Sequence, residues 1–176
     1  IDVGFPVADE KEFSDALGGI AGQGALRVVI WTTTPWTLPA NQAVSLHPEL
    51  DYVIAEVEVA GEKQRLVLAE ALLESVLSRY GLDVSEADKV VVGKCKGADL
   101  EGLKLQHPLY DKQVPIILGE HVTTDAGTGA VHTAPDHGVD DFQVSRKYHI
   151  ETLNLVGPDG VYPVSYTHLT LPTISD

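Results

Sequence analysis

The hydrophobic pattern of this chain changes near residue 69 from strand-like alternation to helical spacing, and that change limits the folds open to it. Apolar and polar residues largely alternate over 51–59 and again over 64–68, which predicts a β-hairpin half-buried on one face. From 69 to 80 apolar residues recur at four-residue spacing, and Gly81 is placed to end the run. An amphipathic helix is therefore expected there, with an apolar stripe that packs in the core.

Short strands dominate the rest of the pattern. A β-branched apolar run at 26–31 predicts a buried strand, and the glycine-rich stretch 18–24 precedes it and is expected to be a loop. Further strands, separated by Gly, Pro and Asp turns, are expected at 89–95, 114–118 and 129–133. A second helix is expected from Asp140 to about Tyr148. The expected fold class is mainly β (α+β), a barrel-like body with a few peripheral helices.

The length of 176 residues and the 44% hydrophobic content are enough for one globular core. The chain starts at Ile1 and contains no methionine, so we expect it to be a piece of a larger protein. Residues 1–163 are expected to form the domain. Residues 164–176 have neither amphipathic periodicity nor a link to what precedes them, which predicts a tail foreign to the domain; an extended C-terminal strand is the alternative.

Charge and composition exclude several classes of function. Twelve basic against 26 acidic side chains give a net charge of −14, which argues against an autonomous nucleic-acid binder, because phosphate contacts need Lys and Arg. No apolar run approaches the roughly 20 residues that span a bilayer, so no membrane partner is expected. The single cysteine, Cys95, fits a reducing compartment, and we expect a cytoplasmic location.

The first segment with chemical potential is 31–41, Trp-Thr-Thr-Thr-Pro-Trp-Thr-Leu-Pro-Ala-Asn. It concentrates hydroxyls, indoles and an amide just after a buried strand. Pro35 and Pro39 stop the strand ladder and fix local backbone angles, so the threonine hydroxyls are expected on a rigid edge. Alternatively, the hydroxyls satisfy the amides of a turn and carry no chemistry.

The second segment is 125–141, in which two glycines permit close backbone approach and histidines and carboxylates follow. Imidazole and carboxylate suit zinc, which would make the polar set a metal site. Its spacing, however, is not the helical His-Glu-x-x-His arrangement, and no second Cys or His pair completes a known pattern. No Gly-x-Ser-x-Gly elbow occurs either. We expect no metal and no cofactor.

Together the two segments resemble the editing domain of bacterial-type isoleucyl-tRNA synthetases, the insertion called connective peptide 1. The resemblance extends from near the N-terminus to about Tyr162. The related valyl and leucyl enzymes have Arg-Pro after the paired threonines, where this chain has Thr34-Pro35, and this favours the isoleucyl member. The family usually has Gly in the position of Asp136, so the turn that places His137 is expected to differ.

The resemblance implies hydrolysis of the ester of mischarged Val-tRNA(Ile), and it leaves open whether valyl-adenylate is cleared too. One methylene separates isoleucine from valine, and a hydrophobic pocket extracts only about 1–3 kcal/mol from it, a magnitude established on enzymes of this same family. A second site that excludes isoleucine by size removes the errors. The implied partners are the 3′ aminoacyl end of tRNA(Ile) and the remainder of isoleucyl-tRNA synthetase. The nucleotide motifs of the aminoacylation site are not present in this sequence.

The resemblance also implies roles for individual residues. The catalytic set is Thr32, Thr33, Thr34, Asn41, His132 and Asp141. The substrate-binding set is Trp36, Thr37, Gly127, Thr128, Gly129, His137 and Asp140. The threonines are expected to receive the terminal adenosine and the ester, His132 to block isoleucine by its bulk, and Asp141 to pair with the substrate α-ammonium. A small metal-dependent hydrolase and a non-catalytic binding module are the alternative functions.

Overall fold

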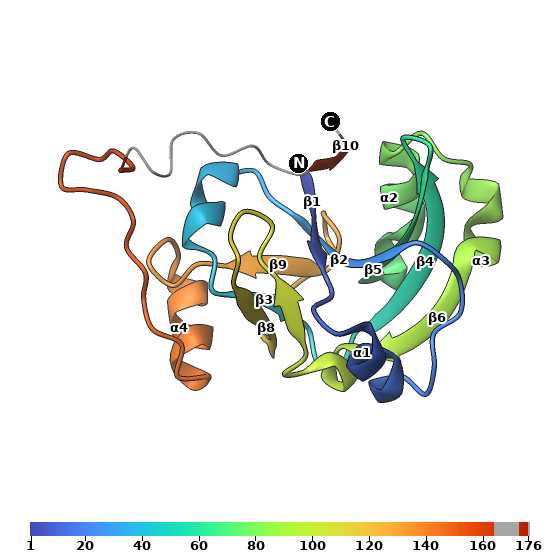
Figure 1. The fold of residues 1–176 in the computed structure, drawn as a ribbon, viewed down its shortest axis with the longest axis horizontal. Coiled ribbons are helices and arrows are strands. Elements are labelled where there is room, and N and C mark those ends of the chain that lie inside the picture. Colours follow the sequence, from blue (N-terminus) through green and yellow to red (C-terminus); the bar gives the residue numbers. More distant parts are fainter. Residues whose placement is uncertain (164–172, 176) are drawn as a thin grey trace.

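The computed structural model describes residues 1–163 and 173–175, which form two mixed β-sheets with short helices around them (Figure 1). The six-stranded sheet contains, in spatial order, β10 (Thr173–Ser175), β1 (Asp2–Pro6), β2 (Ala25–Trp31), β5 (Glu62–Ala69), β4 (Asp51–Val59) and β6 (Val91–Lys96). The four-stranded sheet contains β7 (Lys104–Gln106), β8 (Gln113–Leu118), β3 (Ala43–Leu46) and β9 (Ala130–Thr133). Strands hold more residues than helices, which confirms the mainly β prediction, but the described strands form no closed barrel.

The helices are short and lie outside the sheets. The α-helices are α1 (Glu10–Ala16), α2 (Leu73–Arg79), α3 (Ala87–Val90) and α4 (Val139–Lys147). The 3-10 helices are η1 (Pro35–Ala40), η2 (Glu70–Leu72), η3 (Val84–Glu86) and η4 (Gly97–Leu100). Among the described residues, no helix has the length and apolar character needed to cross a bilayer.

The predicted hairpin is confirmed as β4 and β5, which pair antiparallel from Tyr52↔Ala69 to Val59↔Glu62. The expectation that it is half-buried on one face is wrong. Residues 52–55 and 64–69 are all buried in succession, and successive strand residues point to opposite faces. Both faces of β4 and β5 are therefore covered by packing, to which α2 contributes Leu73, Val76 and Leu77.

The predicted helix at 69–80 is confirmed with altered ends. Ala69 still belongs to β5, η2 makes the first turn, and α2 follows with Leu73, Val76 and Leu77 buried. Gly81 ends the run with φ +70°.

The strand predicted at 89–95 begins only at Val91, so Lys89 and Val90 were assigned wrongly. Both residues belong to α3. The preceding turn, η3, is capped by Asp83, whose carboxylate accepts from the Ser85 N–H. This cap indicates a helix start, but the apolar run that follows it also fits a strand.

The other predicted elements are confirmed as β2, β8, β9, α4 and the 18–24 loop. β10 pairs antiparallel with β1, and Ile174 is buried. The rest of the predicted foreign tail, 164–172 and 176, lies outside the described residues, so the domain boundary at 163 stays a prediction.

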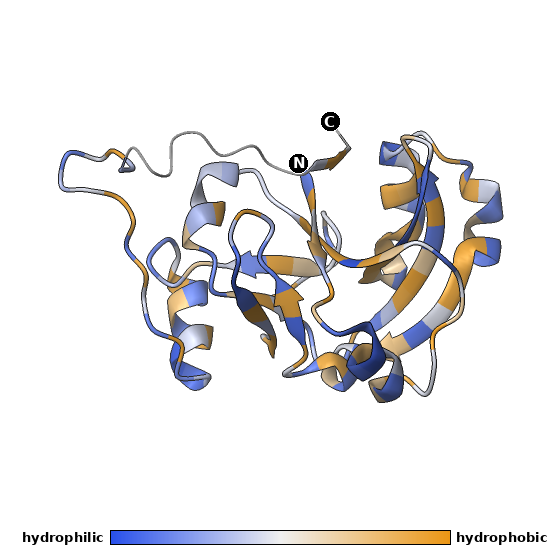
Figure 2. Ribbon diagram, in the orientation of Figure 1, coloured by the Kyte–Doolittle hydropathy of each residue, from blue (hydrophilic) through white to orange (hydrophobic). Residues whose placement is uncertain are grey.

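One large hydrophobic cluster extends over both sheets, and Val44, Ile116 and Ala130 are among its members from the four-stranded sheet. Figure 2 shows the hydrophobic colour concentrated along the strands and α2, whereas α1 is mostly hydrophilic. A small second cluster joins Ala43 of β3, Ile117 of β8 and Val144 of α4. This contact seats α4 against the four-stranded sheet and so places the first turn of α4, which carries Asp141, beside β9.

Candidate functional site

The two polar segments, about a hundred residues apart in sequence, meet at one hollow of about 280 Å³. Its lining residues are Trp31, Thr32, Thr33, Thr34, Val131, His132 and Asp141. The fold brings them together because β3, which follows the first segment, pairs antiparallel with β9, which carries the second: Val44 is the register partner of His132. Five of the six predicted catalytic residues, all except Asn41, thus line the same hollow.

The threonine run turns the chain out of β2 and into η1. Pro35 stands at the first position of η1, where its fixed φ suits a helix start and its missing N–H costs nothing. Thr32 is buried, and its hydroxyl accepts from the Thr34 N–H at 3.0 Å. This contact is the turn-satisfying role that the alternative interpretation predicts. Thr33 and Thr34 are exposed at the hollow.

His132 is 8% exposed and both of its ring nitrogens are occupied. Thr37 Oγ1 lies 2.8 Å from Nε2, and Asn41 Nδ2 lies 3.2 Å from Nδ1. Asn41 Nδ2 also donates to the Ala43 carbonyl at 2.9 Å, so this atom is a donor and Nδ1 accepts from it. The ring proton is then on Nε2, which donates to Thr37.

The Thr37 hydroxyl in turn donates to the Thr34 carbonyl at 2.8 Å, so every hydrogen of the arrangement has an acceptor. Burial, and then the nearby His137, lower the pKa of His132 to about 4. His132 is therefore a neutral ring of fixed tautomer at physiological pH. Thr37 and Asn41, predicted as substrate-binding and catalytic residues, contact His132 from behind and do not line the hollow.

Asp141 lies half-buried in the first turn of α4 and lines the hollow. Its Oδ2 accepts from the Ala134 N–H at 3.0 Å. Burial raises the pKa of this carboxyl above its usual range, and the Ala134 N–H partly opposes the rise. The neighbouring Asp140 is exposed and lines a different hollow with His121 and Lys147, so the structure separates the two carboxylates.

The predicted substrate-binding residues Gly127, Thr128 and Gly129 line a second hollow of about 200 Å³. It shares Trp31 and Val131 with the first, so the two hollows adjoin. Gly127 has φ +83°, and an added Cβ would lie 3.2 Å from the Trp31 side chain. Gly129 has φ +77°, and an added Cβ would lie 2.4 Å from the Ala69 methyl. Both positions thus require glycine.

Two predicted residues lie away from these hollows. Trp36 on η1 is 62% exposed, and its carbonyl accepts from the Tyr162 hydroxyl. His137 is exposed in the turn before α4. Neither lines the first or the second hollow.

Sequence reasoning missed other lining and supporting residues. Trp31 and Val131 line both hollows, His121 lines the second, and Lys112 donates from Nζ to the Asn41 carbonyl at 2.8 Å. The sequence could have indicated Trp31 as a lining residue, because it ends a predicted strand next to the threonine run. Lys112 and His121 lie in loops with no pattern that links them to the site.

Metal ligands and cysteine were the other chemical options. Among residues 1–163 and 173–175, no three His, Cys, Asp or Glu side chains gather closely enough to hold a metal ion. Cys95 lies on β6 of the other sheet, and burial raises the pKa of its thiol to about 12. A thiol that stays protonated at neutral pH is a poor nucleophile.

Comparison with known proteins agrees with this architecture. The family model described as "Leucyl-tRNA synthetase, editing domain" matches residues 20–170. The isoleucine–tRNA ligase of Saccharophagus degradans is 62% identical over 162 residues, 92% of this chain and 16% of that protein. The ligase of Teredinibacter turnerae is 55% identical over the same shares. The chain thus spans about one sixth of the length of these curated relatives.

Solved structures give the same fold. The editing domain of the P. knowlesi cytosolic leucyl-tRNA synthetase superposes with a TM-score of 0.69 at 17% identity, covering 84% of this chain and 62% of that one. The corresponding P. falciparum domain gives 0.68 at 14% identity, covering 84% and 65%. At these identities the likeness shows the fold alone.

Proposed function

Because this chain belongs to the family of leucyl-tRNA synthetase-type editing domains, and by sequence is the isoleucyl-tRNA synthetase member, we propose that it hydrolyses the ester of mischarged Val-tRNA(Ile). The observation that carries the proposal is the hollow in which a neutral, fixed His132 lies with Asp141 and the exposed hydroxyls of Thr33 and Thr34. His132 supplies a rigid and bulky wall, Asp141 supplies a carboxylate, and Thr33 and Thr34 supply hydroxyls.

Asp141 is suited to hold the α-ammonium group of the bound aminoacyl ester. Its Oδ2 accepts from the Ala134 N–H, which orients the carboxylate at the lining of the hollow. A charge-assisted hydrogen bond to an ammonium group is shorter and roughly twice as strong as a neutral one. The pairing also lowers the carboxyl pKa that burial has raised, so substrate binding and ionisation of Asp141 support each other.

His132 is suited to exclude isoleucine by its volume. Thr37 and Asn41 hold its two ring nitrogens, so the ring cannot turn aside without leaving buried polar atoms unpaired. A pocket that must yield to admit one more methylene discriminates weakly, whereas a fixed wall rejects the larger side chain by overlap. Selectivity in this proposal therefore depends on how firmly the ring is held.

The same contacts remove His132 as a general base, because its only lone-pair nitrogen already accepts from Asn41. We propose that Thr33 and Thr34 orient the ester and a water molecule. Water adds to the ester carbonyl carbon, the bond from that carbon to the ribose oxygen breaks, and the ribose oxygen leaves as a hydroxyl with valine as the other product. Positioning supplies most of the acceleration, and we propose that a neighbouring ribose hydroxyl accepts a proton from the attacking water while it passes its own proton to the departing ribose oxygen.

The second hollow adjoins the first beyond Trp31, and we propose that it receives the terminal adenosine when the ester lies in the first. The chain's own charge of −14 opposes contact with the rest of a tRNA. We therefore propose that the remainder of the synthetase holds the tRNA and that this domain receives only its 3′ end, in the cytoplasm.

The test compares two adjacent carboxylates in chelator-containing buffer. Valine release from Val-tRNA(Ile) is measured for the unaltered chain, for Asp141→Ala, and for Asp140→Ala as a matched control that removes an exposed charge outside the hollow. We expect Asp141→Ala to lose activity by more than about a hundredfold, as removal of a charged orienting group does, and Asp140→Ala to stay within about twofold. Equal effects of the two substitutions, or an unaltered chain that releases valine only when the chelator is left out, would overturn the proposal.

A further inference from the structure

An ion pair between the buried Asp2 and the partly exposed Arg79 lies behind the site and joins three parts of the chain. Asp2 at the start of β1 is 2% exposed, and its carboxylate accepts from Arg79 Nη2 at 2.9 and 3.2 Å and from the Tyr80 hydroxyl at 2.7 Å. Burial, with the neighbouring carboxylate, raises the pKa of Tyr80, so its hydroxyl stays protonated and donates. Asp2 thus has the donors that a buried carboxylate needs.

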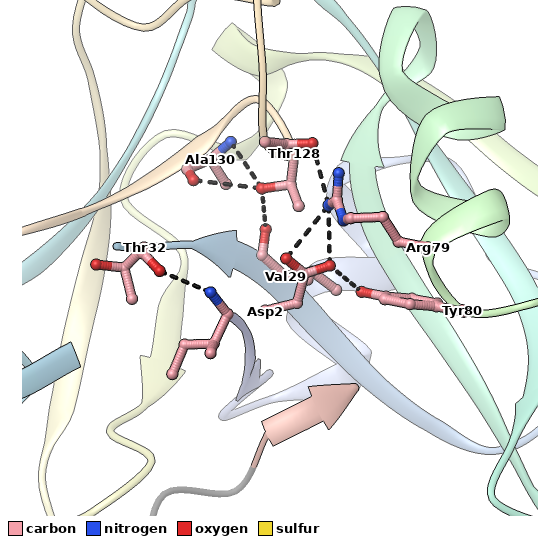
Figure 3. Close-up of polar contacts among 9 residues, drawn as sticks. Asp2, Val29, Thr32, Arg79, Tyr80, Thr128 and Ala130 are labelled. Atoms are coloured by element: carbon pink, nitrogen blue, oxygen red, sulfur yellow. Dashed lines mark hydrogen bonds and ion pairs between the residues drawn. The ribbon is translucent and has the colours of Figure 1, made fainter. Parts of the chain in front are cut away.

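Arg79 reaches from this pair toward the site. The same Nη2 also donates to the Gly127 carbonyl at 3.3 Å. Figure 3 shows the guanidinium between Asp2 and the backbone next to Thr128, at the end of a side chain that projects from α2. One nitrogen of Arg79 therefore contacts both the first strand and the glycine segment that lines the second hollow.

The two residues that Arg79 contacts, Asp2 and Gly127, each lie next to Trp31. Asp2 is the register partner of Trp31 in the pairing of β1 with β2, and the next pair exchanges hydrogen bonds between Ile1 and Thr32 at 2.7 and 2.9 Å. Gly127 packs against the Trp31 side chain so closely that a Cβ would lie 3.2 Å from it. Trp31 lines both hollows. Its backbone is thus fixed through Asp2 and its side chain is covered by Gly127.

We infer that Arg79 is a positioning residue for the editing reaction: by joining Asp2 to Gly127 it holds Trp31 between the two hollows and sets their relative placement. Arg79 lines neither hollow, so it acts through Trp31 and the glycine segment. The inference rests on the proposed function. It goes beyond that function by assigning recognition of the terminal nucleoside partly to α2, an element outside the site.

The control is Arg65, whose side chain is 7% exposed against 33% for Arg79. It pairs with Glu10 at 2.5 Å and donates from Nε to the Gly24 carbonyl at 2.9 Å, so it joins a carboxylate to a glycine carbonyl as Arg79 does, but away from the hollows. Arg79→Gln and Arg65→Gln therefore each remove one ion pair with a carboxylate and one hydrogen bond to a glycine carbonyl. Arg79→Lys keeps a cation beside Asp2 with a shorter reach, so it retains the charge compensation and loses the contact with Gly127.

The experiment measures kcat and KM for Val-tRNA(Ile), thermal unfolding, and hydrogen exchange of the amides at 127–129. For Arg79→Gln and Arg79→Lys we expect KM to rise about tenfold with kcat within about threefold, and exchange at 127–129 to accelerate. Arg65→Gln should lower the unfolding temperature and leave KM and that exchange unchanged.

Exchange at 127–129 that is the same in the Arg79 and Arg65 variants, or a KM that Arg79→Lys leaves unchanged, would overturn the inference. If the unaltered chain hydrolyses no valyl ester, the proposed function fails, and the exchange comparison still decides whether Arg79 holds the glycine segment. If Arg79→Gln does not fold, Arg79→Lys supplies both readouts.

Discussion

The hydroxyl of Thr37 lies 2.8 Å from Nε2 of His132, a residue 95 positions later in the chain. Asn41 faces the other ring nitrogen, and the two contacts together fix a neutral imidazole at the wall of the hollow. A contact between two buried side chains on different elements is held by the packing of both. The shape of this wall is therefore a property of the fold and does not require a ligand to form.

Replacing Thr37 by Val keeps the side-chain shape and removes the acceptor of the His132 Nε2–H. The donor is left buried and unpaired, which costs about 1–3 kcal/mol of unfolding free energy, and the ring gains freedom to move. We expect a lower unfolding temperature together with new hydrolysis of Ile-tRNA(Ile).

Ser45→Ala is the control for Thr37→Val, because it breaks another buried hydroxyl pair, Ser45 with Thr133 at 2.7 Å, whose hydroxyls are not the hydrogen-bond partners of the His132 ring. It should lower stability without relaxing selectivity. Isoleucine release that is the same in both variants would contradict the role of Thr37.

The stability of the domain should fall on mild acidification. Burial lowers the pKa of both His132 and His107 to about 4, whereas in the unfolded chain they titrate near 6.5. Between these values the unfolded state binds more protons, so stability from each ring is fully present above pH 6.5 and is lost as the pH falls toward 4. Each ring contributes at most about 3 kcal/mol.

Urea unfolding at pH 7.5, 6 and 5 measures this loss of stability. The Nε2 atom of His107 lies 3.1 Å from the Leu38 carbonyl oxygen. His107→Gln should reduce the pH dependence of the free energy of unfolding by about half, because one of two equivalent rings is removed. A free energy of unfolding that stays constant from pH 7.5 to 5 would contradict the account of these buried rings.

Gly129→Ala should destabilise the domain more than its backbone angle alone explains. Gly129 has φ +77°, and its added Cβ would lie 2.4 Å from the Ala69 methyl at the end of β5. Gly102 has φ +82° with nothing within 4 Å of such a Cβ, so Gly102→Ala isolates the cost of the backbone angle.

We expect about 1–2 kcal/mol for Gly102→Ala from the backbone angle, and about 1–3 kcal/mol more for Gly129→Ala from the overlap. Chemical denaturation of the two variants gives the comparison. Equal losses would mean that β5 yields to the methyl and that the glycine segment is not tightly packed on it.

Local patterns predicted the elements that lie next to each other in sequence. The β4–β5 hairpin follows from alternation on both sides of Gly61, and α4 follows from its acidic first turn. Short elements without such patterns, such as β3 and β7, gave no signal. The parallel pairing of β2 with β5 is set by distant contacts, which a single sequence does not display.

For the site, the density of polar side chains marked the two segments, the family resemblance gave roles to their residues, and the structure showed where each residue lies. Thr32, Thr33, Thr34, His132 and Asp141 share one hollow, whereas Thr37 and Asn41 support His132. Composition cannot separate a threonine that faces a ligand from one that holds a histidine, because the difference lies in which side of the turn each hydroxyl occupies. The positions of Arg79 and Lys112 depend on tertiary packing alone.

The most direct test measures amino acid release from Val-tRNA(Ile) and from Ile-tRNA(Ile), by the unaltered chain and by His132→Ala, at a domain concentration high enough to offset weak tRNA binding. We predict that the unaltered chain releases valine alone and that His132→Ala also releases isoleucine, because the fixed wall is gone. If His132→Ala still releases valine but no isoleucine, His132 is not the barrier. If the unaltered chain cleaves neither ester, the assignment of editing hydrolysis to this domain is contradicted.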